Sequence, residues 1–358
     1  MSSEPKATLK SVRSAVEEEL SIFLNFESAY LNTISTELSP VSEALTAFLL
    51  DSGKRLRPLF AYAGFAAAGG SLEKPVVRAM SALELLQACA LIHDDLMDGS
   101  DTRRGKPSIH RHFETIHVQD GLDGFAPQYG VSAAVLLGDL ALVWSDQMLN
   151  SAGLTTEQFA RVFPYYNEMR VELMAGQFLD IHEQTQKTTS VDRSMKIARY
   201  KSGKYTIERP LHLGAAMTSS ASPEIFAALS AYGLPLGEAF QLRDDLLGVF
   251  GDPTVTGKPA GDDLREGKRT VLIAMTNDRQ SEAQREIARK HFGKPDLDAQ
   301  GVEALQEIIE STGARAELES TIERLTDAAL AAAESSLFTN DGKALLVELA
   351  NIATKRSA

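Results

Sequence analysis

Residues 83–107 read LELLQACALIHDDLMDGSDTRRGKP and contain the first of two acidic segments around which the chain is organised. Apolar residues recur at helical spacing up to Gly99, so this stretch predicts a helix that ends at the glycine. Because a helix turns by about 100° per residue, Asp94 and Asp98 should lie on one face, one turn apart. Two carboxylates at that separation repel each other unless a cation lies between them.

Basic residues follow this helix directly. Arg103 and Arg104 carry permanent positive charges that suit phosphate oxygens. Mg²⁺ typically binds one or two protein carboxylates together with waters and substrate phosphates. Carboxylates beside arginines therefore predict a site for a diphosphate bound through magnesium.

A second acidic segment lies about 150 residues further on, in QLRDDLLGVFGDPTVTGKPAGDDLREGK. Helical spacing places Gln241, Asp244, Asp245 and Gly248 on one face. A polar stretch then presents Lys258, Asp262, Asp263 and Lys268. The repeated combination of aspartates and lysines strengthens the prediction of a metal and phosphate site.

Three further segments offer candidate side chains. Lys54, Arg55 and Arg57 crowd the turn before Pro58, where they could form an anion site or a solvated turn. A long helix beginning at Thr155 carries Gln177 and Asp180 on one face, as a ligand pair or as a buried polar pair. Lys204 follows Gly203, which we expect to break the helix there, so the lysine could reach a ligand.

Composition limits the classes of function and the cellular location that the protein can have. The 358 residues have a net charge of −13, which argues against nucleic acid as a partner. The single cysteine, Cys89, excludes an internal disulfide and fits a reducing compartment. The N-terminus lacks an apolar core of signal-peptide length, and no run is apolar enough to predict a transmembrane segment. We expect a soluble, cytoplasmic protein.

The fold class predicted is all-α, because no segment shows sustained alternation with period two. We expect residues 1–8 to form a flexible tail and residues 9–358 to form a single domain. Residues 121–130 are rich in glycine and predict a loop.

Taken together, the motifs resemble those of the trans-isoprenyl diphosphate synthases, the polyprenyl synthetase family, and most closely the geranylgeranyl diphosphate synthases. GKRLRP at 53–58, DDLMD at 94–98 with RRG at 103–105, GQFLD at 176–180, the lysine at 204 and the second acidic segment follow in the family's order. The resemblance implies an isoprenoid-synthase fold, which is a helical bundle around a central cavity. It also implies that the protein is a homodimer and a prenyltransferase. Its reaction would be the head-to-tail condensation of isopentenyl diphosphate with dimethylallyl, geranyl or farnesyl diphosphate.

The resemblance also implies a role for each matching residue. About three Mg²⁺ would be held, by Asp94 and Asp98 on one side and by Asp244 on the other, with Asp95 and Asp245 in support. Residues implied to bind substrate are Lys54, Arg55, Arg57, Gln87, Arg103, Arg104, Gln177, Lys204, Thr206, Gln241, Lys258 and Lys268.

Two positions depart from the family's pattern. The second motif usually reads DDxxD, but Gly248 occupies its last position and cannot bind metal. The family's lysine near 204 usually precedes threonine, whereas Tyr205 comes next here and Thr206 follows it. The first departure affects the site of the third Mg²⁺, and the second affects one contact to diphosphate.

Product length in the family depends on the size of the residues four and five positions before the first aspartate. These are Ala90 and Cys89, with Leu86 in the next turn. Both nearer residues are small, so we expect geranylgeranyl diphosphate, with a longer polyprenyl product as the alternative.

Other functions remain as rival hypotheses. A terpene cyclase also ionises an allylic diphosphate, but it would carry an Asn/Ser/Glu metal triad in place of QLRDD. A head-to-head condensing enzyme is disfavoured on similar grounds. A non-catalytic subunit of a heteromeric synthase should lack aspartates or arginines that this chain retains.

Overall fold

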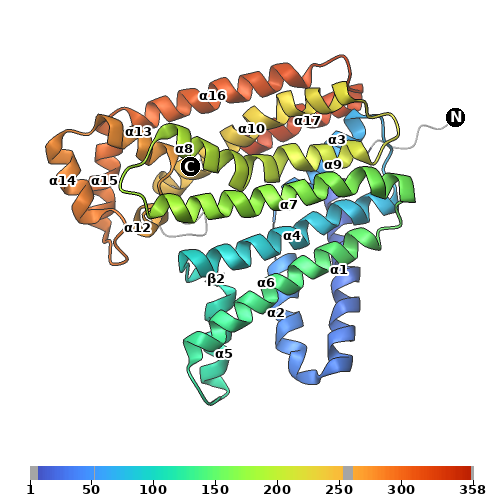
Figure 1. The fold of residues 1–358 in the computed structure, drawn as a ribbon, viewed down its shortest axis with the longest axis horizontal. Helices are drawn as coiled ribbons and strands as arrows, with labels where there is room; N and C mark the ends of the chain where they lie inside the picture. The colour runs from blue at the N-terminus through green and yellow to red at the C-terminus, as the bar shows by residue number, and fades with distance from the viewer. Residues whose placement is uncertain (1–6, 52, 253–260, 356–358) are drawn as a thin grey trace. The chain divides into compact units, whose positions relative to one another are not determined.

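The structure is a computed structural model that describes residues 7–51, 53–252 and 261–355, and helices dominate it (Figure 1). Within these residues the strands are β1 and β2, which form one small antiparallel sheet. The all-α prediction is confirmed.

The chain divides into two compact units. Unit 1 comprises Met1–Tyr62 and Gly70–Arg161, and unit 2 comprises Ala63–Gly69 and Val162–Ala358. The single-domain organisation expected for residues 9–358 stays a prediction.

The first half of the chain contains α1 (Leu9–Ile34), η1 (Thr36–Leu38), α2 (Ser39–Leu50), α3 (Leu56–Ala67), α4 (Lys74–Asp98), β1 (Thr102–Arg103), β2 (Lys106–Pro107), α5 (Ile109–Gln119) and α6 (Ala126–Asn150). The second half contains α7 (Thr156–Gln184), α8 (Val191–Ile197), η2 (Ala198–Glu208), α9 (Arg209–Ala216), α10 (Pro223–Phe250), α12 (Asp262–Glu266), α13 (Val271–Arg279), α14 (Glu282–His291), α15 (Ala299–Ser311), α16 (Ala314–Ala333) and α17 (Asn340–Thr354).

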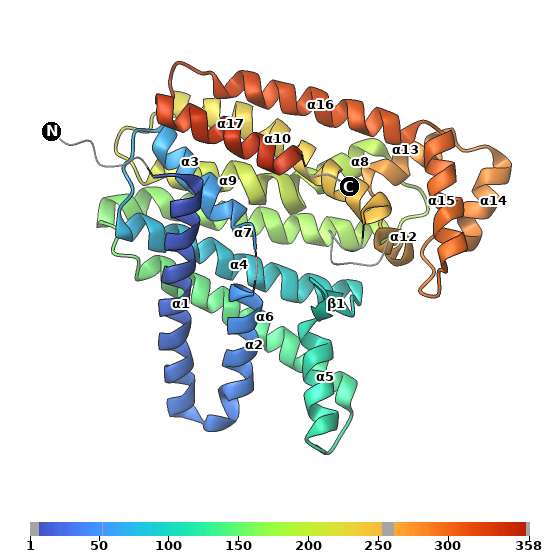
Figure 2. The same ribbon diagram turned by 180° about the vertical axis from the view of Figure 1, so that it is seen from behind.

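Unit 1 is organised around α4, whose middle turns are almost completely buried. α4 packs along α6, and α1 packs against α2 and α4 (Figures 1 and 2). The buried hydroxyl of Ser145 on α6 donates a hydrogen bond to the carbonyl of Ala82 on α4, at 2.6 Å. α4 ends at Gly99, which has a left-handed conformation with φ 68°, as the sequence predicted.

The β1–β2 hairpin follows α4. Arg103 pairs with Lys106, so Arg104 and Gly105 form the turn, with φ of 53° and 74°. Positive φ at both central residues is typical of the tight turns that match the twist of a hairpin. The turn directs the chain back so that Arg103 faces the end of α4.

In unit 2, close approaches at glycines bring α7, η2 and α10 together. A Cβ at Gly176 of α7 would overlap the backbone of Lys201 in η2. A Cβ at Gly203 of η2 would likewise press on the backbone of Gly237 in α10. These contacts allow the polar residues of the three helices to converge.

The helix α10 is central to the rest of unit 2. α10 packs against α16, α17 and η2 (Figure 1). Buried aliphatic residues of α10, α13, α15 and α16 form a continuous hydrophobic core, which includes Leu242, Leu272, Leu305 and Leu318. Burial of such side chains is the main favourable contribution to folding.

Two local expectations were wrong. Residues 121–130 are not a loop throughout, because α6 begins at Ala126 with Pro127 in its first turn, a position where proline is tolerated. Gly203 does not break the helix, because η2 is a π-helix that continues into α9. The missing side chain at Gly203 serves contact with α10.

Two helices, α4 and α6, have the length and apolar composition of a membrane span. Of their most apolar windows, 72% is buried in α4 and 28% in α6. A mostly buried apolar helix is also typical of a soluble protein's core, which fits α4.

Candidate active site

The first half of the candidate site lies on one face of α4 in unit 1. Gln87, Ala90, Asp94 and Asp98 are partly exposed, and buried residues of the helix, such as Cys89, lie between them in sequence. Their spacing places them along one stripe, as the sequence predicted. Asp94 and Asp98 thus offer carboxylates one turn apart.

Asp95 lies on another face and has a different role. Its carboxylate is almost fully buried and accepts hydrogen bonds from Nε of Arg103, at 2.9 and 3.0 Å. Arg103 also contacts it through Nη2, and the same nitrogen lies 3.7 Å from Asp94 Oδ2. The Asp95–Arg103 pair therefore fastens the hairpin to the end of α4.

Arg104, in the turn of the hairpin, is an exposed cation of unit 1. Arg104 donates to the Phe48 carbonyl at 3.4 Å and lies over the Phe48 ring. Burial, together with the charge of Arg103, lowers the pKa of Arg104.

The turn before Pro58 also separates its three cations. Arg55 is buried, with φ 53°, and donates to Glu84 at 2.9 Å and to the Leu49 carbonyl at 2.6 Å. Lys54 is exposed and Arg57 is partly exposed. The turn is therefore supported by Arg55, and the other two cations are more accessible.

The second half of the candidate site lies in unit 2 on α10. Asp244 is exposed, whereas Asp245 is buried and accepts a hydrogen bond from Gln241 at 2.8 Å. Burial raises the pKa of Asp245 to about 8, and the nearby charges of Asp263, Asp244 and Asp180 act in the same direction. The hydrogen bond from Gln241 offsets only part of this. A bound cation would relieve the repulsion.

A lysine that the sequence analysis did not single out faces this acidic group. Lys201 Nζ lies 2.6 Å from Asp180 Oδ2 on α7. Lys204, by contrast, contacts Glu172 and lies 3.7 Å from Glu208. Burial alone would raise the pKa of Glu172, but hydrogen bonds from Arg209 and Lys204 outweigh it and the pKa is lowered.

Gly248 makes room for another carboxylate. A Cβ at this position would overlap Oδ2 of Asp263, which comes from α12. The carboxylate of Asp263 therefore lies beside α10 at the position where a side chain at 248 would begin. The last position of the second motif is therefore a glycine in the sequence, but the carboxylate of Asp263 lies beside it in the structure.

Comparison with known proteins supplies the identification. The family model described as polyprenyl synthetase matches residues 39–309. The crystal structure of a geranylgeranyl pyrophosphate synthase from Corynebacterium glutamicum, complexed with isoprenyl diphosphate and magnesium, superposes with a TM-score of 0.94 at 42% identity, covering 98% of this chain and all of that one.

This chain belongs to the polyprenyl synthetase family.

Curated relatives of the family agree. A geranylgeranyl diphosphate synthase of Mycobacterium tuberculosis is 34% identical over 265 residues, covering 73% of this chain and 69% of its own. A geranylfarnesyl diphosphate synthase of Aeropyrum pernix is 34% identical over 225 residues, covering 62% of this chain and 65% of its own. Like these relatives, the protein is a prenyltransferase.

The structure groups the predicted residues of this polyprenyl synthetase by unit. Unit 1 contains Lys54, Arg57, Gln87, Asp94, Asp95, Asp98, Arg103 and Arg104. Unit 2 contains Gln177, Lys204, Thr206, Gln241, Asp244, Asp245 and Lys268. Lys258 lies outside the described residues. Whether Asp94 and Asp244 face one diphosphate stays a prediction.

The structure describes the surroundings of three further predicted substrate-binding residues, whose roles stay predictions. Arg55 is buried and forms an ion pair with Glu84. Thr206 is also buried. Lys268 lies 2.8 Å from Glu266 and 3.8 Å from Asp263, which links it to the second acidic segment.

The positions predicted to set product length lie on different faces of α4. Ala90 shares the partly exposed stripe with Asp94, whereas Cys89 is buried and its sulfur lies 3.8 Å from Nδ1 of His93. Cys89 lies five residues before Asp94, so it points about 140° away around the helix. Leu86 is fully buried.

Lys201 and Asp263 are the functional candidates that the sequence analysis missed or left without a role. For Lys201 a signal was present, since KS at 201–202 resembles the lysine and hydroxyl residue expected near 204. Asp263 could not be recognised, because its relationship to Gly248 arises from the fold.

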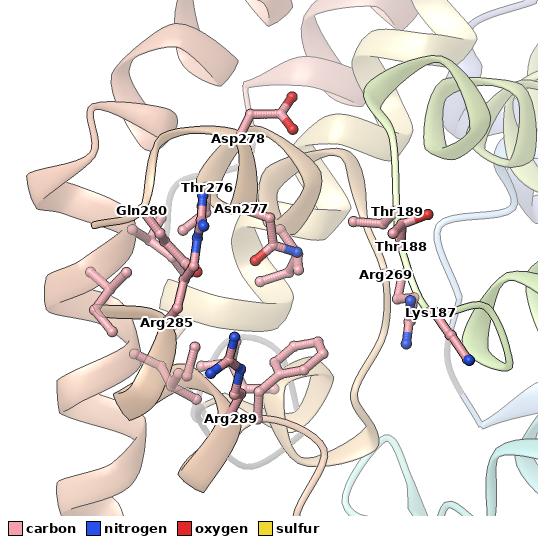
Figure 3. A pocket seen from close by; sticks show the side chains of 17 residues that line it. Lys187, Thr188, Thr189, Arg269, Thr276, Asn277, Asp278, Gln280, Arg285 and Arg289 are labelled. Carbon is pink, nitrogen blue, oxygen red and sulfur yellow. The ribbon is translucent and has the colours of Figure 1, made fainter. Parts of the chain in front are cut away.

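A cavity of about 530 Å³ lies elsewhere in unit 2 (Figure 3). Lys187 and Arg269 lie on one side, and Arg285 and Arg289 come from α14. The aliphatic residues that also line the cavity, such as Ile273 and Ile309, are buried in the core. Of the predicted site residues that the structure describes, none lines this cavity.

Proposed function

We propose that the protein condenses isopentenyl diphosphate with an allylic diphosphate, head to tail, and releases a trans-prenyl diphosphate, most simply geranylgeranyl diphosphate. The observation that carries the proposal is the pair of aspartates Asp94 and Asp98 beside Arg103 in a member of this family. Dimethylallyl, geranyl and farnesyl diphosphates are the proposed allylic substrates.

The carboxylates suit magnesium. Among the described residues, no group of three or more His, Cys, Asp or Glu side chains could enclose a metal ion by itself. Mg²⁺ does not need such a group, since it retains waters and completes its shell with substrate phosphates. Asp94, Asp98 and Asp244 would hold about three ions, and these would stabilise the negative charge of the leaving diphosphate.

The basic residues would hold the two diphosphates. In unit 1, Arg103 contacts Asp95 and lies 3.7 Å from Asp94. In unit 2, Lys201 contacts Asp180, whose charge acts on Asp245. Each cation could donate hydrogen bonds to diphosphate oxygens. Lys54, Arg57 and Arg104 would bind isopentenyl diphosphate. Fixed charges of this kind stabilise the transition state when the C–O bond breaks, because they need not reorganise. No covalent nucleophile is required.

The departure at Gly248 does not remove the third ion in this proposal. Asp263 supplies a carboxylate at the place where the side chain of residue 248 would begin. We therefore assign Asp263 to the support of the site that Asp244 forms.

The proposed product has twenty carbons, because Ala90 is the small residue on the stripe that carries Asp94. Relatives with C20 and C25 products both occur among the matches. A longer polyprenyl product is the alternative, and the size of the product distinguishes the two.

We propose further that the enzyme is a cytoplasmic homodimer. Large apolar side chains are exposed on two helices of unit 1: Val135, Leu136 and Val143 on α6, and Ile22, Phe26, Tyr30 and Ile34 on α1. Groups of exposed large apolar side chains are typical of protein interfaces.

The test is to supply the purified chain alone with isopentenyl diphosphate, each allylic primer and Mg²⁺, and to measure product size. We expect condensation that stops when EDTA is added and falls severely in Asp94→Ala. Absence of turnover with every primer would favour a non-catalytic subunit. A cyclic or head-to-head product would also contradict the proposal.

A further inference from the structure

The imidazole of His93 occupies a notch in the surface of α6. A Cβ at Gly138 would overlap the His93 ring at Nε2, so the glycine is what allows the ring to lie there. Nε2 lies 3.2 Å from the carbonyl oxygen of Val135. Close packing of this kind leaves the ring little freedom to change its position.

The hydrogen bonds around the ring are mutually consistent. A carbonyl only accepts, so Nε2 must carry the proton that it donates to Val135. Nδ1 lies 3.8 Å from the thiol of Cys89, one turn earlier, and Nε2 lies 3.8 Å from Oδ1 of Asp139 on α6. Burial raises the pKa of Cys89 to about 12, so the thiol keeps its proton at neutral pH. Cys89, His93 and α6 thus form one connected group.

His93 and Asp95 fasten α4 on either side of Asp94. His93 is held by α6, and Asp95 is held by Arg103 of the hairpin. The two residues point about 160° apart around the helix, so together they resist rotation of its last turns. Asp94 lies between them in sequence, and its direction is set by the backbone that they hold.

We propose that His93, seated against Gly138, is a positioning residue that fixes the rotation of α4 and so directs Asp94 toward magnesium. This inference rests on the proposed function, because it assumes that Asp94 binds the metal. Side chains that orient metal ligands typically change metal affinity by about 10- to 100-fold when they are replaced. A similar loss is expected when His93 is removed.

The experiment measures the Mg²⁺ concentration that gives half-maximal thermal stabilisation of the full chain in the presence of inorganic diphosphate. The same variants are then compared for the Mg²⁺ dependence of condensation. We expect His93→Ala to raise both values about 10-fold or more, and His93→Gln, which can still donate to Val135, to recover part of the loss.

Gly138→Ala should act like His93→Ala, because its Cβ expels the ring from the notch. The double variant His93→Ala/Gly138→Ala should be no worse than either single variant, since both remove the same contact. This non-additivity keeps the test decisive if one variant folds poorly.

Ser145→Ala is the matched control for simple loosening of α4 against α6. It removes a buried hydrogen bond between these helices at Ala82, eleven residues before His93. It should lower the melting temperature without changing the Mg²⁺ midpoint. If His93→Ala and Gly138→Ala behave in the same way as Ser145→Ala, His93 is only structural and the inference fails.

Asp94→Ala separates this failure from failure of the proposed function. If the wild type shows no Mg²⁺-dependent stabilisation, or if Asp94→Ala retains it, the assignment of the metal ligand is wrong. If the wild type responds, Asp94→Ala does not and His93→Ala matches the wild type, only the positioning role is wrong.

Discussion

Gly248 and Asp263 are complementary, because the carboxylate of Asp263 fills the space in which a side chain at position 248 would begin. They come from α10 and α12 and lie fifteen residues apart in sequence. The second motif lacks its last aspartate, and Asp263 supplies a carboxylate beside that position. Exchanging the residue types at positions 248 and 263 tests whether Asp263 replaces the missing aspartate.

Transferring the carboxylate from position 263 to position 248 should restore the activity that each single substitution reduces. Gly248→Asp should impair the enzyme, since the new side chain overlaps Asp263 and adds a like charge. Asp263→Ala should raise the Mg²⁺ concentration for half-maximal rate. The double variant Gly248→Asp/Asp263→Ala should lie closer to wild type than either, as measured by Mg²⁺ titration of the condensation rate. Purely additive losses would contradict the idea that the residues share one place.

Lys201 should matter more for the allylic diphosphate than Lys204. Removing a hydrogen bond to a charged group costs about 1.5–3 kcal/mol. Lys201→Met should therefore raise the KM for the allylic substrate about 10-fold or more, whereas Lys204→Met should mainly lower the melting temperature by disturbing Glu172. Steady-state kinetics and thermal melts distinguish them. The opposite pattern would restore the assignment of Lys204 that the sequence suggested.

Ala90→Phe should shorten the product, because Ala90 lies on the stripe of α4 that carries Asp94. Cys89→Phe should instead destabilise the protein by about 1–3 kcal/mol, the usual cost of overpacking a buried position. Product sizing and denaturant unfolding provide the measurements. Shorter products from Cys89→Phe in a stable protein would show that position 89 does line the chain's path.

Acid should destabilise the fold through His212. Burial lowers the pKa of His212 from 6.5 to about 4, with a further contribution from the charge of Arg209. The unfolded chain therefore binds a proton at this residue before the folded protein does, so stability is lost as pH falls from 6.5 toward 4. The loss should reach about 3 kcal/mol. His212→Asn should show a flatter dependence of unfolding free energy on pH, and identical curves would exclude this role.

The exposed apolar face of α6 should be needed for dimerisation. Leu136→Asp places a charge among Val135 and Val143 and should shift the protein toward monomer in sedimentation velocity. Leu337→Asp, at another exposed apolar residue, is the control and should leave the oligomeric state unchanged. A Leu136→Asp protein with the wild-type sedimentation coefficient would place the interface elsewhere.

Local sequence signals predicted local structure well. Gly99 ends α4 in a left-handed conformation, and the helix expected to begin at Thr155 is α7, which Thr155 caps through reciprocal hydrogen bonds with Gln158. The spacing of Asp94 and Asp98 also placed both on the partly exposed stripe of α4. Such features depend on neighbours within one turn, which the sequence displays directly.

Features that depend on packing between elements could not be predicted in the same way. Gly203 was interpreted as a helix break because its contact with Gly237 is invisible in the sequence. The direction of Cys89 toward His93 and the position of Asp263 beside Gly248 have the same origin. Each requires knowledge of which helices meet and at which residue.

The enclosure of Cys89 has a practical consequence for spectroscopy. As the protein's only cysteine, it keeps its proton and is shielded from reagents, so maleimides and oxidants should leave it untouched in the folded enzyme. Fluorophores or spin labels can therefore be attached at newly introduced surface cysteines while the native thiol is left in place.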